Sequence, residues 1–333
     1  MISVAEKPYV IGIDVGGTNT VFGVVDARGT VLASGKIKTS THAKVSDYID
    51  ELGDALIPLI EEVGGQHLIK GIGVGAPNAN YFTGAIENAA NLNWKERIPF
   101  AHLLSEKTGL SVAITNDANA TAIGEMTYGA ARGMKDFIVI TLGTGVGSGI
   151  VIGGNLVYGH DGFAGELGHV IVRRDGRICG CGRKGCLETY TSATGVTRTA
   201  KEFLRTREDA SLLRELDVET ITSKDVYDAA LKGDSLALEI FETTGRILGE
   251  TLADAVAFSS PEAIILFGGL AQAGALIMDP IRRSMEENLL HIYKGKVKLL
   301  MSELKESDAA ILGASALGWS ADREYLQRVT TIE

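Results

Sequence analysis

Short apolar runs separated by glycine-rich turns organise the start of the chain. Residues 9–13 are apolar and lead into D-V-G-G-T-N at 14–19, and apolar residues recur at 20–25 and 31–37. Runs of this length, rich in Val and Ile and bounded by glycine and asparagine, are typical of β-strands joined by tight turns. The pattern therefore predicts a three-stranded meander at the beginning of the fold.

A longer period replaces this pattern after residue 44. The apolar side chains that share the spacing of one helix face are Val45, Ile49, Leu52, Leu56 and Leu59. Residues 70–75 and 112–114 are again short apolar runs and predict buried strands. Asn116 and Asp117 follow the second run, and either side chain can accept a hydrogen bond from a free N–H group at a helix start. We expect a helix from this point to residue 128.

The pattern of the first strands restarts at residue 137. F-I-V-I-T-L at 137–142 predicts a strand, G-T-G-V-G-S-G at 143–149 a glycine turn, and 150–158 a further strand, turn and strand. This internal repeat predicts a duplicated α/β fold with a cleft between two lobes.

The remaining segments complete the second half. Residues 187–260 are mainly helical in pattern, and 263–269 is a strand that ends in a double glycine before another helix. Residues 296–301 predict a further strand. The small-residue segment 307–319 predicts a closing helix that packs back onto the first lobe.

Length and charge restrict the class of protein. With 333 residues the chain can form two lobes, which we predict to be a small lobe of residues 1–117 and 308–333 and a large lobe of residues 118–307. The net charge of −10 disfavours a general nucleic-acid binder, which needs a basic surface. No apolar run approaches the roughly 18 residues of a membrane span, and the first residues lack the apolar core of a secretory signal. We therefore expect a cytoplasmic protein that binds neither membrane nor nucleic acid.

All three cysteines lie in one segment, E-L-G-H-V-I-V-R-R-D-G-R-I-C-G-C-G-R-K-G-C-L-E. The side chains that suit tetrahedral zinc are His169, Cys179, Cys181 and Cys186. A disulfide is disfavoured because a C-x-C pair is too close along the chain and three is an odd number. Three unrelated buried thiols would not explain the clustering with glycines and histidine. Four protein ligands leave no open coordination position, so the sequence predicts a structural zinc site.

Two carboxylates, Glu166 and Glu188, flank this segment. A metal would hold them near each other, where they can bind a polar ligand. His169 can bind the metal through one ring nitrogen and a ligand through the other, although a backbone carbonyl is the commoner partner of the second nitrogen.

The two glycine turns are candidates for phosphate binding, because glycine allows close approach of the backbone and its N–H groups. The alternative for each turn alone is an ordinary hairpin, and the repeat of both turns favours the phosphate hypothesis. Neither matches a Walker loop, and the first turn leads into a strand, unlike a Rossmann loop. The candidate residues are Gly16, Gly17, Thr18, Asn19, Gly143, Thr144 and Gly145.

Two aspartates stand at the ends of predicted strands. Asp14 borders the first glycine turn and can hold Mg²⁺ against phosphates, or it can simply cap the turn. Asp117 lies in T-N-D-A-N-A-T at a strand-to-helix junction, where it can accept a proton from an attacking hydroxyl. Its alternative role is to cap the helix, and Asn116 can take that role instead.

Taken together, D-V-G-G-T-N, L-G-T-G-V-G-S-G and A-G-E-L-G-H followed by C-G-C-G-R-K-G-C-L-E strongly resemble the ROK family of repressors, open reading frames and sugar kinases. The likeness extends from Tyr9 to about Trp319 and is closest to the bacterial glucokinases of the family. It implies an actin-like, ribonuclease-H-like pair of lobes that close around ATP and a hexose. It also implies a homodimer.

The resemblance assigns roles to individual residues. Asp117 becomes the general base for the sugar hydroxyl, and the turns at 12–19 and 142–149 serve the phosphates of ATP. Gly268 and Gly269 lie near the adenosine. The residues expected to bind sugar hydroxyls are Asn116, Glu166, His169 and Glu188, with Asn78 in the sugar loop, and the zinc ligands are those named above.

Two departures from the family pattern stand out. Many members carry lysine where this chain has Asn19, so a contact near the phosphates is missing. The usual A-P-G before the sugar loop reads Ala76-Pro77-Asn78, which puts in question how residues 78–91 meet the sugar.

The activity implied is ATP-dependent phosphorylation of glucose at its 6-hydroxyl. The motifs also suit kinases for N-acetylglucosamine, N-acetylmannosamine, fructose or mannose, because these hexoses share hydroxyl groups. A more distant alternative is a sugar-responsive transcriptional regulator, which would carry a DNA-binding module ahead of the first glycine turn. Only eight residues precede Tyr9 here.

Overall fold

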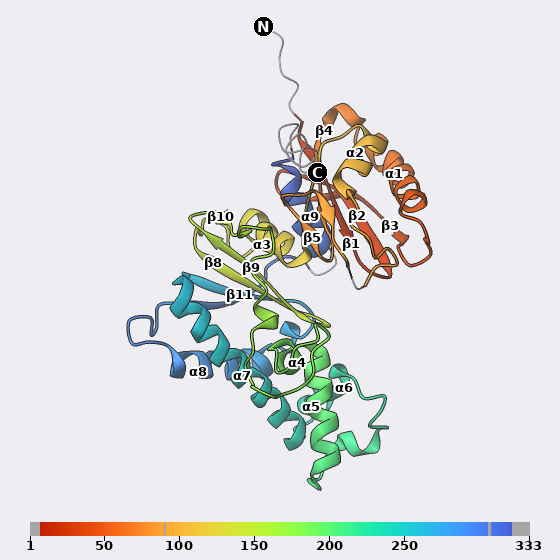
Figure 1. Ribbon diagram of the computed structural model, residues 1–333. Coiled ribbons are helices and arrows are strands. Elements are labelled where there is room, and N and C mark those ends of the chain that lie inside the picture. Colours follow the sequence, from red (N-terminus) through yellow and green to blue (C-terminus); the bar gives the residue numbers. More distant parts are fainter. Residues whose placement is uncertain (1–6, 90, 306–307, 322–333) are drawn as a thin grey trace.

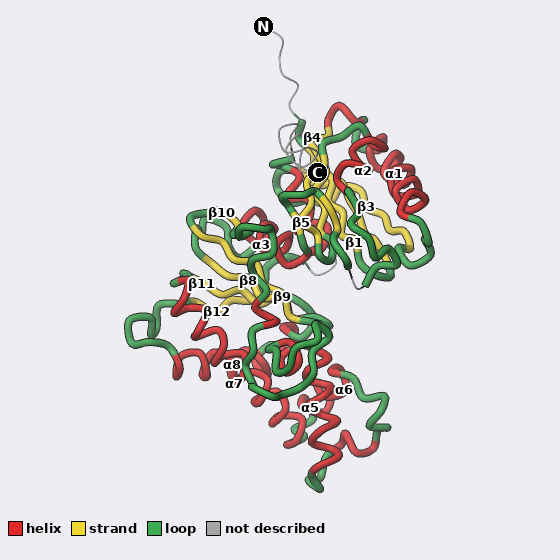
Figure 2. Tube along the Cα trace, in the orientation of Figure 1, coloured by secondary structure: helices red, strands yellow, loops and turns green. Residues whose placement is uncertain are grey.

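Two sheets organise the computed structural model, which describes residues 7–89, 91–305 and 308–321 (Figures 1 and 2). The first sheet has the order β3-β2-β1-β4-β7. Its first three strands pair antiparallel as a meander, and the last two add in parallel beside β1. The strands are β1 (Tyr9–Val15), β2 (Asn19–Asp26), β3 (Val31–Lys38), β4 (Ile69–Gly75) and β7 (Val112–Thr115).

The second sheet repeats this plan in the order β10-β9-β8-β11-β12. Its meander is again antiparallel, and two strands again add in parallel beside the first strand of the meander. The predicted internal repeat is therefore confirmed. The strands are β8 (Phe137–Leu142), β9 (Val146–Ile152), β10 (Asn155–Leu156), β11 (Ala263–Phe267) and β12 (Lys298–Met301).

Helices α1 (Val45–Glu62) and α2 (Phe100–Thr108) bury one face of the first sheet. The apolar face predicted for α1 supplies Ile49, Leu52 and Leu56 to this core, where they join Ile11 and Ile13 of β1. The short helix η1 (Gln66–Leu68) leads into β4. Strands β5 (Ala79–Asn80) and β6 (Ala85–Ile86) form a separate two-stranded hairpin that belongs to the same core.

A second layer of helices buries one face of the second sheet (Figure 1). As predicted, the segment after the cysteines is mainly helical. Within the residues that the structure describes, no helix combines the length and apolar character needed to cross a membrane. The elements of this layer and its connections are η2 (Leu167–His169), α4 (Glu188–Thr191), α5 (Ala193–Thr206), η3 (Leu212–Glu215), α6 (Ser223–Leu231), α7 (Ser235–Ser259), η4 (Ala271–Ala273) and α8 (Ala275–Asn288).

Helices α3 (Asp117–Tyr128) and α9 (Ala309–Gly318) lie where the two halves meet (Figure 1). α9 is the predicted closing helix and packs back onto the first sheet, so closely that a Cβ on Gly73 would lie 2.0 Å from the Ala314 carbonyl oxygen. α3 packs on the second sheet and also contacts α9. The proposed lobe boundary after residue 117 falls at the start of α3, and residues 322–333 of the predicted small lobe lie outside the described residues.

One predicted element is shorter than expected. The glycine segment 143–149 was expected to be a turn, yet β9 already begins at Val146. The reason lies in packing: a Cβ on Gly149 would come within 2.5 Å of the Ala122 Cβ on α3. Glycine in this segment therefore serves close contact between a strand and a helix as well as the turn.

Candidate active site

A cleft of about 540 Å³ lies between the two halves. Both glycine hairpins, the start of α3 and the acids beside the cysteine segment reach it. The predicted site residues that line it are Asp14, Gly16, Gly17, Asn78, Asn116, Asp117, Gly143, Thr144, Gly145, Glu166, Glu188 and Gly268. Residues far apart in the sequence, from both halves of the repeat, thus meet in one place.

Four of the residues predicted to bind the nucleotide or the sugar do not line this cleft. Thr18 and Asn19 are exposed at the hairpin, where the Thr18 carbonyl accepts a hydrogen bond from the Thr39 N–H at 3.0 Å. Gly269 lines a neighbouring cavity of about 430 Å³, which also reaches Gly143 of the second hairpin. The fourth, His169, belongs to the cysteine cluster described below.

The junction of β7 and α3 separates the two roles considered for Asn116 and Asp117. The Asn116 side-chain oxygen accepts a hydrogen bond from the Asn119 N–H at 2.7 Å and caps the helix. Asp117 is therefore free to face the cleft. Its Oδ1 accepts from the Ala118 N–H at 2.8 Å, which orients the carboxylate. Although the side chain is open to the cleft, the surrounding protein desolvates its charge and raises its pKa.

Asp14, near the end of β1, is the second acid at the bottom of the cleft. Burial, with a smaller contribution from the charge of Asp117, raises the pKa of Asp14 to about 7. Gly75 lies beside both acids, since a Cβ there would be 3.6 Å from the Asp14 Oδ1 and 3.8 Å from the Asp117 Cα. Desolvated acids with raised pKa values in a cleft are typical of functional sites.

Glu188 links the second hairpin to the cysteine segment. Its Oε2 accepts from the Val146 N–H at 3.0 Å, and its Oε1 lies 3.8 Å from the Cys179 sulfur. Gly145 leaves room for this carboxylate, because a Cβ there would lie 2.2 Å from the same Oε2 and displace it. Glu166, on the other side, is open to the cleft, yet the surrounding protein desolvates its charge and raises its pKa, and nearby His169 partly offsets that rise.

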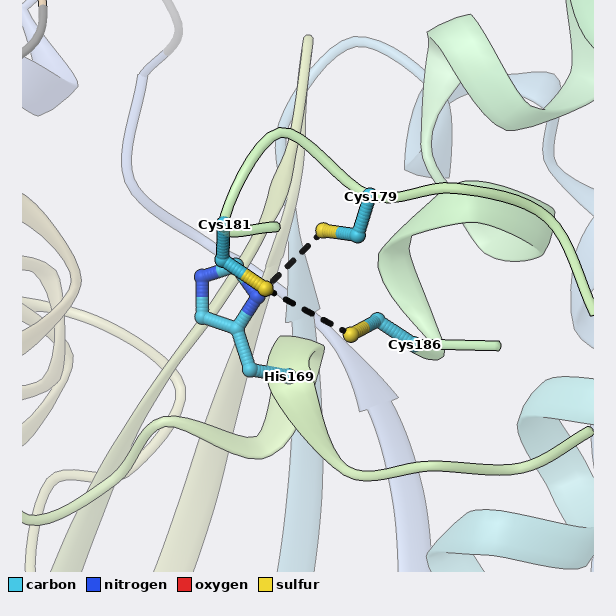
Figure 3. Close-up of side chains that lie close together, drawn as sticks. All are labelled: His169, Cys179, Cys181 and Cys186. Atoms are coloured by element: carbon cyan, nitrogen blue, oxygen red, sulfur yellow. Dashed lines mark hydrogen bonds between the residues drawn. The ribbon is translucent and has the colours of Figure 1, made fainter. Parts of the chain in front are cut away.

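The cysteine cluster has the geometry of a metal site (Figure 3). The four ligand atoms of His169, Cys179, Cys181 and Cys186 all lie within 4.8 Å of one another. The Cys181 and Cys186 sulfurs are 3.7 Å apart, as are the Cys179 sulfur and the His169 Nδ1. Sulfurs bound tetrahedrally to one zinc at about 2.3 Å would be separated by roughly 3.8 Å. A disulfide would need about 2.05 Å, and all three cysteines are free.

His169 also lies beside one acid of the cleft. Its Nε2 lies 3.8 Å from the Glu166 Oε2, while Nδ1 faces the cysteines. Nδ1 thus lies among the candidate metal ligands, and Nε2 lies beside a carboxylate of the cleft. The cluster therefore holds the two segments that present Glu166 and Glu188.

Asn78 has a backbone role that explains one departure from the family pattern. Its φ is 52°, in the left-handed region where glycine is favoured and asparagine is tolerated. Its side-chain amide donates to the carbonyls of Glu87 at 3.1 Å and Asn88 at 3.4 Å. Asn78 thus has a conformation that glycine would also favour, and its side chain ties together the loop that follows.

Sequence reasoning missed Thr141 and Phe163, which line the cleft, and covered Asn91 and Ser148 only as members of the segments 78–91 and 142–149. Ser148 lies within the glycine segment but was treated as part of a turn. Phe163 lies between Gly162 and Gly165, which both have positive φ. The two glycines beside an aromatic residue were the signal in the sequence that could have indicated a loop of defined shape at the cleft.

The matched sheets and the cleft between them define an actin-like protein of two lobes. A family model described as the ROK family matches residues 10–320, and the chain belongs to this family. It is 35% identical to a glucokinase of Halalkalibacterium halodurans over 93% of this chain and 94% of that protein. It is 29% identical to a xylose repressor of Bacillus spizizenii over 93% of this chain and 76% of the repressor. A Streptomyces griseus ROK glucokinase, crystallised with glucose and AMPPNP, superposes with a TM-score of 0.78 at 35% identity, covering 94% of this chain and 99% of that one.

Proposed function

We propose that this protein is a glucokinase that transfers the terminal phosphoryl group of ATP to the 6-hydroxyl of glucose. The observation that carries the proposal is the position of Asp117, which opens into the same cleft as both glycine hairpins. The similarity to glucokinases over nearly the full length of each chain supports the choice of substrate.

Asp117 is the general base of the proposed reaction. An alcohol is a weak nucleophile, so removal of its proton as the bond to phosphorus forms assists the transfer. The Ala118 N–H holds Oδ1, which leaves Oδ2 to accept the proton. A raised pKa makes the Asp117 carboxylate a stronger base than an exposed aspartate.

The nucleotide occupies the side of the cleft formed by the hairpins. We assign the phosphates to the two glycine hairpins that line the cleft and the adenosine to the cavity beside Gly269. Asp14 would hold Mg²⁺. The positive charge of the bound ion would offset the negative charges of the Asp14 carboxylate and of the phosphates. Thr18, Asn19, Thr144, Gly145 and Gly268 stay predicted neighbours of the nucleotide.

The sugar occupies the opposite side. We assign its hydroxyls to Asn116, Glu166, Glu188 and the Nε2 of His169. Asn78 contributes through the loop that it ties together.

Zinc is the metal that the cysteine cluster fits best. Three thiolates and one imidazole are its preferred ligands, and four protein ligands complete a closed tetrahedral site. When bound, the metal would make this part of the cleft rigid, because Glu188 contacts the ligand Cys179 and Glu166 contacts the ligand His169. The thiols need a reducing compartment, which agrees with the cytoplasm, where we place the enzyme.

A coupled assay of ADP formation tests the function. Across glucose, N-acetylglucosamine, N-acetylmannosamine, fructose and mannose, we expect the highest kcat/KM with glucose. Asp117→Asn should lose about 10²- to 10⁴-fold in kcat while keeping its zinc and its melting temperature. The exposed Asp209→Asn serves as a control. Wild-type kcat in Asp117→Asn would remove Asp117 from this role, and another preferred hexose would reassign the substrate.

The similarity to a repressor keeps a DNA-binding regulator as the second candidate. A regulator would bind duplex DNA at low salt without turning over ATP, so a gel-shift assay separates it from a kinase. We also propose a homodimer, which light scattering tests directly.

A further inference from the structure

A loop of the large lobe reaches across to the small lobe beside the cleft. This bridging loop, residues 157–166, is held at both ends by the second sheet. The Val157 N–H donates to the Ile150 carbonyl at 2.8 Å, and the Ser148 hydroxyl donates to the Gly165 carbonyl. Between these anchors the loop contacts the β5–β6 hairpin, which belongs to the core of the first sheet.

Asn80 of that hairpin makes the polar part of the contact. It is only 2% exposed, and its Nδ2 donates to the Asp161 carbonyl at 2.7 Å. Its Oδ1 accepts from the N–H groups of Phe82 at 2.9 Å and Thr83 at 3.3 Å. Gly162 leaves room for the amide, since a Cβ there would lie 2.5 Å from the same Oδ1. One end of the amide therefore serves its own hairpin and the other end holds the bridging loop.

Three aromatic rings join the same two segments. Tyr81 stacks on Tyr158 with 4.2 Å between ring centroids and 10° between planes, and Phe82 lies 5.7 Å from Tyr158. Stacked and tilted rings attract one another beyond the burial of their surface. The hydrogen bond of Asn80 is therefore reinforced by an apolar contact beside it.

The bridging loop carries residues of the cleft. Phe163 and Glu166 both line it, and the Phe163 N–H donates to the Asp161 Oδ1 at 3.3 Å. Asp161, which Asn80 holds, and Glu166, the acid assigned to the sugar, are thus only five positions apart in the chain. Where Glu166 lies depends on the opposite lobe as well as on the metal cluster.

We propose that Asn80 is a positioning residue for the sugar site. From the small lobe it fixes the bridging loop, and through that loop it places Phe163 and Glu166 in the cleft. This inference rests on the proposed hexose kinase function. A displaced loop weakens the grip on the sugar and leaves the nucleotide side, formed by the hairpins, in place.

Asn80→Asp tests the role with a change of one group. The aspartate keeps the acceptor for Phe82 and Thr83 but replaces the donor with an oxygen that faces the Asp161 carbonyl. We expect the KM for glucose to rise about tenfold or more, the KM for ATP to stay within about twofold, and kcat to fall less than the KM rises. Asn155→Asp is the matched control, because its amide donates to the Gly153 carbonyl at 3.2 Å within its own hairpin.

Tyr158→Leu provides an independent variant that removes the stack and leaves Asn80 intact. It should also raise the KM for glucose and spare the KM for ATP, which a general loss of stability would not do. If the wild type phosphorylates glucose and both variants keep its KM for glucose, the role of Asn80 is refuted. A wild type that phosphorylates no hexose would instead refute the proposed function.

Discussion

Asp14 and Asp117 place two carboxyl groups at the bottom of one cleft, and burial is the largest influence on the pKa of each. Burial disfavours the charged form of a carboxyl group. It raises the pKa of Asp14 in the folded protein to about 7, against 3.8 for an unperturbed aspartate. Between these values the folded state binds more protons than the unfolded state. Stability therefore falls as pH rises, by up to about 1.4 kcal/mol per pH unit, and the loss is complete above the folded pKa.

Asp14→Asn should remove this loss, because the amide stays neutral at every pH. Without ATP and Mg²⁺, we expect the variant to melt above the wild type at about pH 8.5 and the gap to narrow toward about pH 6. Both values stay clear of the isoelectric point of 5.2. Catalysis should be impaired, since the proposed Mg²⁺ ligand is lost. Asp209→Asn is an exposed control, and an Asp14→Asn protein less stable than wild type at the higher pH would contradict the argument.

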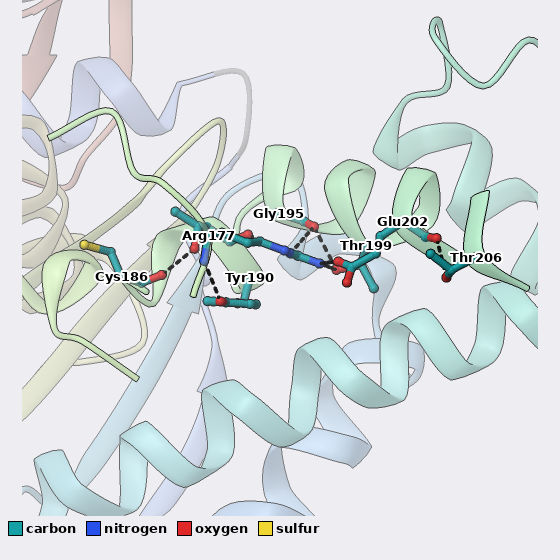
Figure 4. Close-up of polar contacts among 8 residues, drawn as sticks. Arg177, Cys186, Tyr190, Gly195, Thr199, Glu202 and Thr206 are labelled. Carbon is teal, nitrogen blue, oxygen red and sulfur yellow. Dashed lines mark hydrogen bonds and ion pairs between the residues drawn. The ribbon is translucent and has the colours of Figure 1, made fainter. Parts of the chain in front are cut away.

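At the scale of elements, the cysteine segment is fastened to its helices by an arginine as well as by its own ligands (Figure 4). The Arg177 guanidinium lies 4.6 Å from the Tyr190 ring centroid and donates to the Thr189 carbonyl at 2.8 Å, and its ion pair with Glu202 measures 2.7 Å. These partners lie on α4 and α5. Because Glu188 begins α4, Arg177 ties the loop of Cys179 to the helix that presents a cleft acid.

Arg177→Met should keep the apolar stem and lose these donors. We expect the zinc-loaded variant to release its metal to a chromogenic chelator at least about tenfold faster than wild type, because several part-buried hydrogen bonds from a charged group are lost. Arg198→Met is the comparison, since exposed Arg198 makes a hydrogen bond to the same loop, to the Ile178 carbonyl at 2.9 Å, and should have the smaller effect. Release at the wild-type rate in both variants would mean that the ligands alone hold the loop.

Whether an element could be predicted from the sequence depends on how far apart along the chain the interacting residues lie. The strands and the start of α3 depend on local apolar pattern and on the cap of Asn116, so they were predictable. The bridging loop was not, because the bond of Asn80 to Asp161 joins positions 81 residues apart. The role of Asn78 was also hidden, since its φ is a property of the folded backbone.

At the scale of the whole molecule, the two lobes meet where α3 crosses α9. The contact is made by glycine on both sides, since a Cβ on Gly124 would lie 2.7 Å from the Gly313 Cα. At the C-terminal ends of the two helices, the Trp319 indole N–H donates to the Tyr128 hydroxyl at 2.6 Å. α3 also begins with Asp117, so the crossing that joins the lobes fixes the proposed base relative to the first sheet.

Gly124→Ala tests whether α3 and α9 pack as closely as the contact between Gly124 and Gly313 indicates. In an ordinary helix interior, glycine to alanine stabilises by roughly 0.5–1 kcal/mol. Here the added methyl meets backbone atoms that no side-chain rotation can move, so we expect a loss of about 1–3 kcal/mol in the free energy of unfolding and a lower kcat. Gly53→Ala in α1 is the comparison, because the added methyl there meets only side-chain atoms, the nearest being the Lys107 Cγ at 2.4 Å, and no backbone atom. In a denaturant titration the loss should therefore be larger for Gly124→Ala than for Gly53→Ala. If both variants were equally stable, the lobes would have to meet less closely than the Gly124–Gly313 contact requires, and α3 could not be the rigid connection that holds Asp117 in place.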